Sequence, residues 1–352
     1  MRKNVLYYGS LFVLLFGLTL NGCSKTSNPK NDTNNEVSSN TNNEANNDAS
    51  NEANSESNNA NNTNEDANNE SLTAVTFTDA LGREVTVDQP KKVAALMGSF
   101  AEVWVLSGGE LAGVTDDAAS ERNLTLSDDV ALLGTMQAPN VEALIDADID
   151  FVILSSNVAE HVKLKDTLEL AGINCAFFNV ESFEDYLSML KICTDITGDK
   201  ESYTKNGENV KAEIEAAIAR KPEGAAPTVL FLRAFSTGIK AKGSDSMTGI
   251  MLKDMGCINI ADSDESLLED ISMEKIIEED PDYIFVVTMG SSEEKAFEMI
   301  EKTLISNPAW SELKAVKENH YVVLPKQLFH LKPNNKWGAS YEILADILYG
   351  EN

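Results

Sequence analysis

Histidine is scarce in this chain of 352 residues, which contains three. His161 is expected to open a helix and His320 a strand, while His330 lies in a third segment. A zinc or other bare transition-metal site needs several imidazole or carboxylate ligands that converge on one point. The sequence therefore predicts no direct metal site.

Cysteine is also scarce. Beyond Cys23, the chain has Cys175, Cys193 and Cys257, which lie in apolar surroundings without C-x-x-C spacing. Three is an odd number, so at least one thiol must stay unpaired within the chain. We expect buried free thiols, and a Cys175–Cys193 disulfide is the alternative.

Basic residues are too few to balance the acidic ones. The chain has 28 Lys and Arg against 57 Asp and Glu, which gives a formal net charge of −29. A charge of this sign argues against nucleic acid or an anionic membrane surface as a direct partner. The net charge does not exclude a locally basic pocket.

The N-terminus has the pattern of an export signal. Arg2 and Lys3 precede an apolar run, 11–20, that is too short to span a bilayer comfortably. The run ends in Leu-Asn-Gly-Cys at 20–23, which resembles the bacterial lipobox, where cleavage occurs before a lipidated cysteine. We therefore expect a lipoprotein signal peptide at 1–22 and a lipid such as palmitate on Cys23. A plain signal peptide followed by an incidental cysteine is the alternative.

A low-complexity segment follows. Residues 24–70 are rich in Asn, Ser, Glu, Thr and Ala and contain no aromatic residue. Such a segment buries too little apolar surface to offset its chain entropy. A flexible coil of this length has an end-to-end distance of roughly 40 Å. We interpret 23–71, including Cys23, as a lipidated, disordered tether.

The remaining chain alternates short apolar runs with helical stretches and is long enough for two domains. Buried strands are expected at 92–96, 151–154, 228–232 and 283–287. This alternation predicts an α/β fold, with two lobes of mostly parallel sheet flanked by helices.

An internal repeat supports two lobes of one design. Residues 140–151 align without a gap on residues 272–283, and each copy predicts a short helix that leads into a strand. Asn140 and Ser272 are placed to cap the helices, and Glu142 and Glu274 fall in the first turns. The apolar pairs Leu144-Ile145 and Ile276-Ile277 are expected to face a core.

Between the copies, 182–221 predicts helix almost throughout, with a break near 197–199. Its second part is amphipathic, and a helix of about 20 residues spans about 30 Å, enough to connect two lobes. We expect an N-terminal lobe at 72–196, a connecting helix at 197–222 and a C-terminal lobe at 223–352.

The chain resembles the substrate-binding proteins of ABC importers for iron–siderophore complexes, haem and cobalamin, which have a helical backbone between the lobes. The resemblance rests on the entry segment 78–87 followed by Pro-Lys-Lys-Val at 90–93, on the two glutamate modules, on the connecting helix, and on 310–317 before a strand at 320–324. It covers essentially the whole chain after the tether. It implies ligand held between two lobes that close little on binding.

The resemblance also implies that an acidic residue on each lobe meets arginines of the membrane permease. The matching positions are Glu142 and Glu274. The competing interpretation is that both residues only favour a helix N-terminus, a contribution of typically about 0.3–1 kcal/mol each.

Ligand contacts are expected on loops that follow strand ends. The nominated residues are Met97, Phe100, Met136, Arg233, Lys240, Lys242, Met289, His330, Lys332 and Trp337, with Gln137, residues 155–157, Phe329 and Lys336 as further candidates. An arginine at a strand end presents a fixed fork to a carboxylate, which siderophores and haem propionates carry. Aromatic and methionine side chains suit a macrocycle or a catecholate ring.

His330, and a methionine such as Met136 or Met289, are also candidate ligands of haem iron, for which a structural histidine and core packing are the alternatives.

We therefore expect an extracytoplasmic receptor that delivers an iron complex to an ABC permease and its ATPase. A ferric siderophore is the first expectation, haem the second and cobalamin the alternative. The receptor is expected to be a monomer without a cofactor, on the outer face of the cytoplasmic membrane.

An anchored extracellular enzyme is less favoured, because the sequence has no G-x-S-x-G, H-E-x-x-H or G-x-x-x-x-G-K motif. The adjacent acids Asp116 and Asp117 are interpreted as turn residues. An adhesive or scaffolding lipoprotein would explain the tether, but not the duplicated lobes.

Overall fold

The structure is a computed structural model that describes residues 6–7, 73–263, 266–269, 271–290 and 292–350. Apart from Leu6–Tyr7, the expected signal peptide, Cys23 and the tether lie outside these residues. Across the described part of the chain, no helix combines the length and the apolar character needed to cross a membrane.

The N-terminal lobe is built on a sheet with strand order β10-β9-β4-β5-β6, in which all neighbours are parallel. Two hairpins, β2–β3 and β7–β8, accompany the sheet. The strands are β2 (Val75–Thr78), β3 (Glu84–Val87), β4 (Val93–Ala95), β5 (Leu111–Val114), β6 (Ala131–Leu132), β7 (Gly134–Thr135), β8 (Ala138–Pro139), β9 (Phe151–Ser155) and β10 (Asn174–Phe178). The helices are α1 (Gly98–Leu106), α2 (Asp117–Ser120), α3 (Val141–Asp146), α4 (Ala159–Lys163) and α5 (Lys165–Leu170).

The C-terminal lobe has strand order β1-β15-β14-β11-β12, and β13 also pairs with β11. Only the β11–β12 pair is antiparallel among the described strands of this sheet. The strands are β1 (Leu6–Tyr7), β11 (Thr228–Phe235), β12 (Gly238–Ala241), β13 (Ile258–Asn259), β14 (Tyr283–Thr288) and β15 (Tyr321–Leu324). The helices are α9 (Met247–Asp254), α10 (Ser266–Glu269), α11 (Met273–Glu279), α12 (Glu293–Ile300), α13 (Lys314–Lys317), α14 (Lys326–Phe329) and α15 (Trp337–Tyr349). The four strands predicted from apolar runs, now β4, β9, β11 and β14, are confirmed.

Both faces of each sheet are buried, so consecutive strand residues, which point to opposite faces, pack in separate apolar clusters. In β11, Val229 and Phe231 pack in one apolar cluster, while Leu230 and Leu232 pack in another. The first cluster is continuous with the corresponding face of the N-terminal sheet. The predicted two-lobed α/β fold is therefore confirmed.

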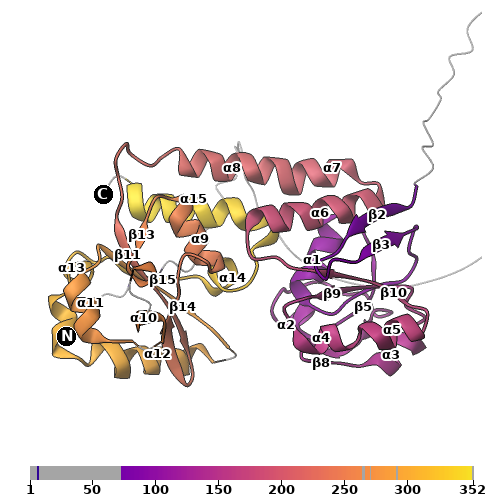
Figure 1. Cartoon of the computed structure of the whole chain (residues 1–352), viewed down its shortest axis with the longest axis horizontal. Helices are drawn as coiled ribbons and strands as arrows, with labels where there is room; N and C mark the ends of the chain where they lie inside the picture. Colours follow the sequence, from indigo (N-terminus) through magenta and orange to yellow (C-terminus); the bar gives the residue numbers. More distant parts are fainter. Residues whose placement is uncertain (1–5, 8–72, 264–265, 270, 291, 351–352) are drawn as a thin grey trace, which may run out of the picture. The chain divides into compact units, whose positions relative to one another are not determined.

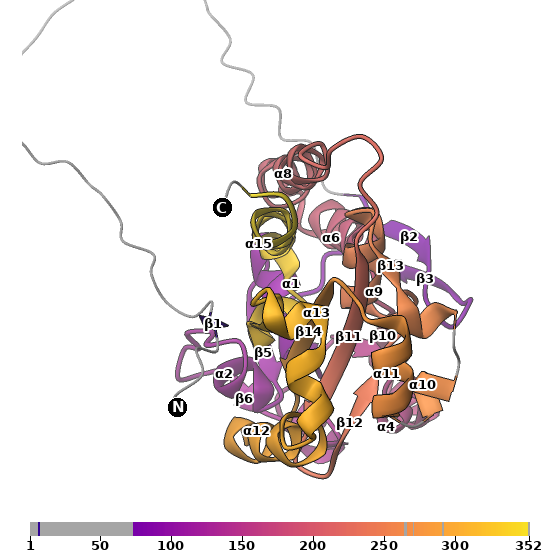
Figure 2. The same cartoon turned by 90° about the vertical axis from the view of Figure 1, so that its left-hand side faces the viewer.

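Three helices link the lobes: α6 (Phe183–Thr197), α7 (Lys200–Tyr203) and α8 (Asn209–Ile218), with a π-helical turn between α7 and α8. Ser182 caps α6 in a capping box with Asp185, and α6 ends at Gly198, whose φ of 78° suits glycine. The buried side chains of α8 include Val210 and Ile214, and α8 packs along α15. Figures 1 and 2 both show α8 and α15 on one side of the C-terminal sheet and α12 on the other.

The internal repeat is present in detail. The Asn140 and Ser272 side chains accept hydrogen bonds from the N–H groups of Ala143 and Lys275, so both caps are confirmed. Asp148 and Asp280, which correspond in the repeat, both follow the helix of their module and have positive φ, 52° and 38°.

One expectation about the repeat is wrong. Leu144 and Ile276 are fully buried, but Ile145 and Ile277 are 50% and 43% exposed. Consecutive residues of an α-helix lie about 100° apart, so a short helix on a sheet buries only one member of each apolar pair.

The three described cysteines, Cys175, Cys193 and Cys257, are free and buried, as expected, and the alternative Cys175–Cys193 disulfide is absent. Burial raises the pKa of both Cys193 and Cys257 to about 12. Their thiols are therefore protonated and unreactive under ordinary conditions.

Candidate functional site

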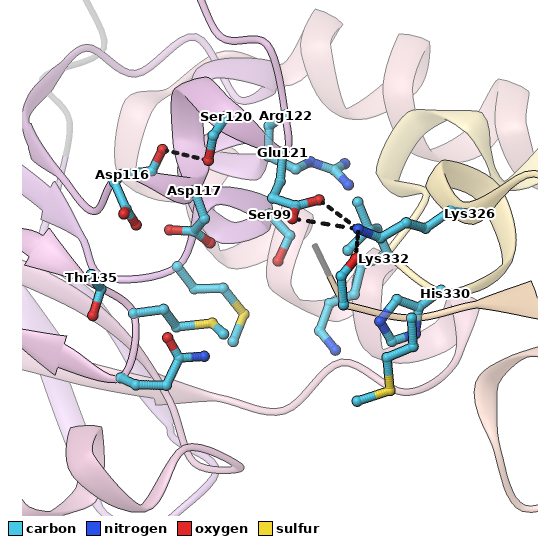
Figure 3. A pocket seen from close by; sticks show the side chains of 16 residues that line it. Ser99, Asp116, Asp117, Ser120, Glu121, Arg122, Thr135, Lys326, His330 and Lys332 are labelled. Carbon is cyan, nitrogen blue, oxygen red and sulfur yellow. Dashed lines mark hydrogen bonds and ion pairs between the residues drawn. The ribbon is translucent and has the colours of Figure 1, made fainter. Parts of the chain in front are cut away.

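A cavity of about 600 Å³ is lined by residues of both lobes (Figure 3). This volume lies within the range of small-molecule sites. The N-terminal lobe contributes Met97, Ser99, Asp116, Asp117, Ser120, Glu121, Arg122, Thr135, Met136 and Gln137, and the C-terminal lobe contributes Met289, Gly290, Lys326, His330, Leu331 and Lys332.

Asp117 fixes the wall formed by the starts of α1 and α2. Its Oδ2 accepts a hydrogen bond of 2.7 Å from the Gly98 N–H, and its Oδ1 accepts one of 2.6 Å from the Thr115 hydroxyl. A Cβ at Gly98 would lie 2.7 Å from the Asp117 backbone, so only glycine allows this approach. The Asp117 carboxylate is thus engaged in holding two loops, in keeping with its interpretation as a turn residue.

Met136 and Gln137 form the tip of the β7–β8 hairpin at the cavity wall. The hairpin is tightened by a hydrogen bond of 3.0 Å from the Ala138 N–H to the Thr135 hydroxyl. Gly134 has a φ of 81°, and a Cβ there would lie 2.7 Å from the Ala138 carbonyl oxygen. The backbone at the base of the tip is therefore restricted to one conformation.

His161 fixes the position of the β7–β8 hairpin tip through hydrogen bonds of its side chain. Its side chain is fully buried, its Nδ1 accepts a hydrogen bond of 3.1 Å from the Ser155 N–H, and its Nε2 lies 2.9 Å from the Met136 carbonyl oxygen. Because Nδ1 is an acceptor, the proton must be on Nε2, which donates to Met136. Burial lowers the pKa of His161, which favours this neutral form.

An ion pair crosses the cavity between the lobes. Lys326 Nζ lies 3.2 and 3.4 Å from the two Glu121 carboxylate oxygens and donates to the Gly290 carbonyl oxygen at 3.0 Å. Figure 3 shows Glu121 and Lys326 pointing toward one another, with Asp116, Asp117 and Thr135 across the cavity. The Lys326 side chain is 10% exposed, so this pair is shielded more than a surface ion pair.

A second polar link joins the lobes beside the cavity. Asn334 donates to the Ser99 carbonyl oxygen at 2.9 Å and to Glu102 Oε2 at 2.6 Å. Arg122 pairs with the same Glu102 oxygen. The charge of Arg122 is thus matched by a buried carboxylate.

His330 is a neutral imidazole in the C-terminal wall. The pKa of His330 is lowered to about 4, first by burial and then by the nearby cations Arg233, Lys326 and Lys332. Its Nδ1 is buried and has no hydrogen-bond partner among the described residues. No group in the described part of the chain therefore fixes the tautomer of His330, and the neutral ring keeps a free lone pair near neutral pH.

The cations of the wall face acidic partners. Burial lowers the pKa of Lys332, whose Nζ lies 3.9 Å from Glu181 Oε1. Burial also lowers the pKa of Arg233, which lies outside the cavity lining and interacts electrostatically with the same Glu181. The lining itself contains three carboxylates (Asp116, Asp117, Glu121) and three cations (Arg122, Lys326, Lys332). The cavity is consequently charge-balanced rather than strongly basic.

Five of the nominated ligand contacts line the cavity: Met97, Met136, Met289, His330 and Lys332. Gln137 lines it as well.

The other nominated residues lie elsewhere. Phe100 and Trp337 are fully buried in the core, where the inner faces of α1 and α15 place them, as is Phe329. Lys240 is a register partner of Arg233 across β11–β12 and donates to the Glu269 carbonyl oxygen. Arg233, Lys242, Lys336 and residues 155–157 are not part of the cavity lining, although Ser155 anchors His161.

Several lining residues are not among those nominated from the sequence. Asp116 to Arg122 directly follow β5, so the rule that sites form at strand ends, applied to β5, would have found them. Lys326 follows β15 in the same way. Within the described residues, no group of three or more His, Cys, Asp or Glu side chains is arranged to hold a metal ion.

The family model described as "Periplasmic binding protein" matches residues 93–328. The chain therefore belongs to the periplasmic binding protein family, a family of solute-binding proteins rather than enzymes.

Individual relatives are distant. The ABC transporter substrate-binding lipoprotein YhfQ of Bacillus subtilis (strain 168) is 21% identical over 273 residues, which cover 73% of this chain and 83% of YhfQ. The high-affinity heme uptake system protein IsdE of Staphylococcus aureus (strain MRSA252) is 23% identical over 222 residues, covering 63% and 75%. The structure of Staphylococcus aureus SirA complexed with staphyloferrin B matches with a TM-score of 0.61 and 19% identity, covering 78% of this chain and 97% of SirA.

Proposed function

We propose that this chain is an extracytoplasmic receptor that captures an iron complex and delivers it to an ABC permease with its ATPase. The main support is the composition of the cavity between the lobes, whose lining contains three methionine thioethers, a neutral histidine and cations in ion pairs. The names of the relatives support this class of ligand, since IsdE is named for heme uptake and SirA is complexed with a siderophore.

Within this class, haem fits the cavity best. Met97, Met136 and Met289 offer soft, polarisable contacts to a flat apolar macrocycle. His330, neutral above a pKa of about 4, and a methionine are the protein ligands that haem iron accepts. Lys326 and Lys332 carry charge suited to two propionates.

A ferric siderophore is the second candidate, favoured by the three cations of the lining. A strongly anionic siderophore must compete with Glu121 for Lys326 and with Glu181 for Lys332. Haem, with two carboxylates, meets less of this competition. Cobalamin is the third ligand to test.

Permease docking is assigned to Glu142 and Glu274. Both lie in the exposed first turns of α3 and α11, and the described residues give neither carboxylate an ion-pair partner. Replacing both with arginine should abolish uptake while ligand affinity stays unchanged. Loss of ligand affinity would overturn the assignment, because it would show that the two acids support the fold or the cavity.

The anchor is assigned to lipid on Cys23, with the chain as a monomer on the outer face of the cytoplasmic membrane. YhfQ is named a lipoprotein, and a tether holds a receptor near its permease at high effective concentration. Metabolic labelling with an alkyne-bearing palmitate analogue should mark the wild-type chain but not Cys23→Ser. Labelling of both would place the lipid elsewhere.

Ligand choice is tested by quenching of tryptophan fluorescence in the full chain with haemin, a ferric tris-catecholate, a ferric hydroxamate and cobalamin, each added separately. We expect saturable quenching by haemin, weakened by Met136→Ala and unaffected by Met189→Ala, a core methionine outside the cavity. Quenching by a ferric siderophore alone would select the second candidate. Equal quenching of wild type and Met136→Ala would show that Met136 does not contact the ligand.

A further inference from the structure

Two isoleucines at equivalent positions of the two lobes are exposed. Ile145 on α3 is 50% exposed and Ile277 on α11 is 43% exposed. A single exposed isoleucine needs no explanation in a soluble protein. Here the same exposure recurs in both copies of the repeat, on helices that bury their preceding residues, Leu144 and Ile276, completely.

The fold gives α3 and α11 the same setting. Leu144 packs on the face of the N-terminal sheet opposite the cluster that contains α8 and α15 residues. Ile276 packs on the corresponding face of the C-terminal sheet. Both helices therefore present their outer surface on the side of their sheet away from the helical connector (Figure 1).

Each isoleucine lies beside the glutamate assigned to docking. Glu142 and Ile145, like Glu274 and Ile277, are three residues apart, a spacing that places two side chains on one helix surface. The other exposed residues of these two helices are acidic, apart from Lys275, whose side chain is 42% exposed and pairs with Glu278. Each lobe thus presents one apolar side chain among mostly acidic ones, which resembles the apolar centre and polar rim of a protein interface.

We infer that Ile145 and Ile277 are apolar anchors of the permease interface. The partner surface would carry, at each of two sites, a basic side chain for the glutamate and an apolar depression for the isoleucine. The inference rests on the proposed docking through Glu142 and Glu274 and adds a contact to it. The basic group would supply orientation, and burial of the isoleucine would stabilise the docked state.

The first test identifies the neighbour of each isoleucine. A photocrosslinking amino acid is placed at position 145 or 277 of the full, lipidated chain in intact cells, with positions 170 and 258 as controls. Leu170 and Ile258 are also exposed apolar residues, 90% and 54%, but lie outside α3 and α11. We expect adducts with an ABC permease subunit from 145 and 277 and none from the controls. Adducts with a second copy of this chain would overturn the inference.

The second test measures the contribution of the contact with that permease complex in nanodiscs. Ile145→Thr and Ile277→Thr keep a β-branched side chain but shorten it and replace its apolar end with a hydroxyl. Each should weaken permease binding about fivefold, and the double variant about 25-fold, from the apolar area lost at two separate sites. Ile258→Thr should bind like wild type, and all variants should keep their melting temperature and haemin affinity.

Two outcomes separate this inference from the proposed docking. If Glu142→Arg with Glu274→Arg abolishes permease binding but both threonine variants bind like wild type, the anchor inference is overturned and the docking stands. If the charge reversal also leaves binding unchanged, the docking fails, and this inference fails with it.

Discussion

Replacing His161 tests how the cavity wall is positioned. Asn at 161 keeps an oxygen that can accept from the Ser155 N–H, but it is too short to donate to the Met136 carbonyl oxygen. Gln at 161 extends an amide N–H toward that oxygen. The pair of variants thus separates the bond that holds the Met136 tip from the bond that holds the strand end.

The size of the effect follows from the bond that is lost. Leaving a buried acceptor without a donor costs about 1–3 kcal/mol. The bond to Met136 is partly buried, so we expect a loss near the lower end, about 1 kcal/mol, for the positioning of the tip. If ligand binding has to restore that position, affinity falls about fivefold.

The assay is NMR of the full chain with ¹³C-methyl methionine, together with a haemin titration. His161→Asn should shift and broaden the Met136 methyl signal, leave that of the core residue Met189 in place, and weaken haemin binding about fivefold. His161→Gln should restore both towards wild type. Equal haemin affinity of all three proteins, with an unmoved Met136 signal, would refute the positioning role.

Three further predictions concern charge and packing. The pKa of His330 in the folded chain is about 4, below its usual value, so between about pH 6.5 and pH 4 the unfolded chain binds more protons than the folded one. The free energy of unfolding, measured by urea denaturation, should therefore fall as the pH drops through that window, and it should fall less steeply in His330→Gln. Glu121→Gln frees Lys326 from its ion pair, so haemin should bind about threefold to tenfold more tightly at low salt, an effect that 0.5 M NaCl reduces; unchanged affinity would show that Lys326 does not face the ligand. Gly338→Ala places a Cβ against the Glu213 side chain, between α15 and α8, and should lower the free energy of unfolding by about 1–3 kcal/mol, whereas an unaltered value would show that the Glu213 side chain moves aside without cost.

Much of the fold follows from local patterns. The apolar runs gave the central strands because both faces of a covered parallel sheet are buried, and the Asn140 and Ser272 caps followed from residue type and position. The exposure of Ile145 could not be predicted from the sequence, because two consecutive apolar residues on a short helix do not show which of them packs on the sheet. Only the position of the sheet decides this.

The site was only partly predictable. Strand-end reasoning placed Met97, Met136 and Met289 at the cavity, because parallel strands end at one edge. It also nominated Phe100 and Trp337, which helix orientation turns into the core. Charge balance was not predictable, since pairs such as Lys326 and Glu121 are 205 residues apart in the sequence.

The central claim is that the cavity captures an iron complex through His330 and a thioether. The most direct measurement is the Soret spectrum of haemin titrated into the full chain, its His330→Ala variant and the control His320→Ala, whose histidine lies outside the cavity. We expect a saturable shift in wild type and in His320→Ala that changes form or is lost in His330→Ala. Identical spectra and affinities for all three proteins, or no saturable shift in any, would contradict it.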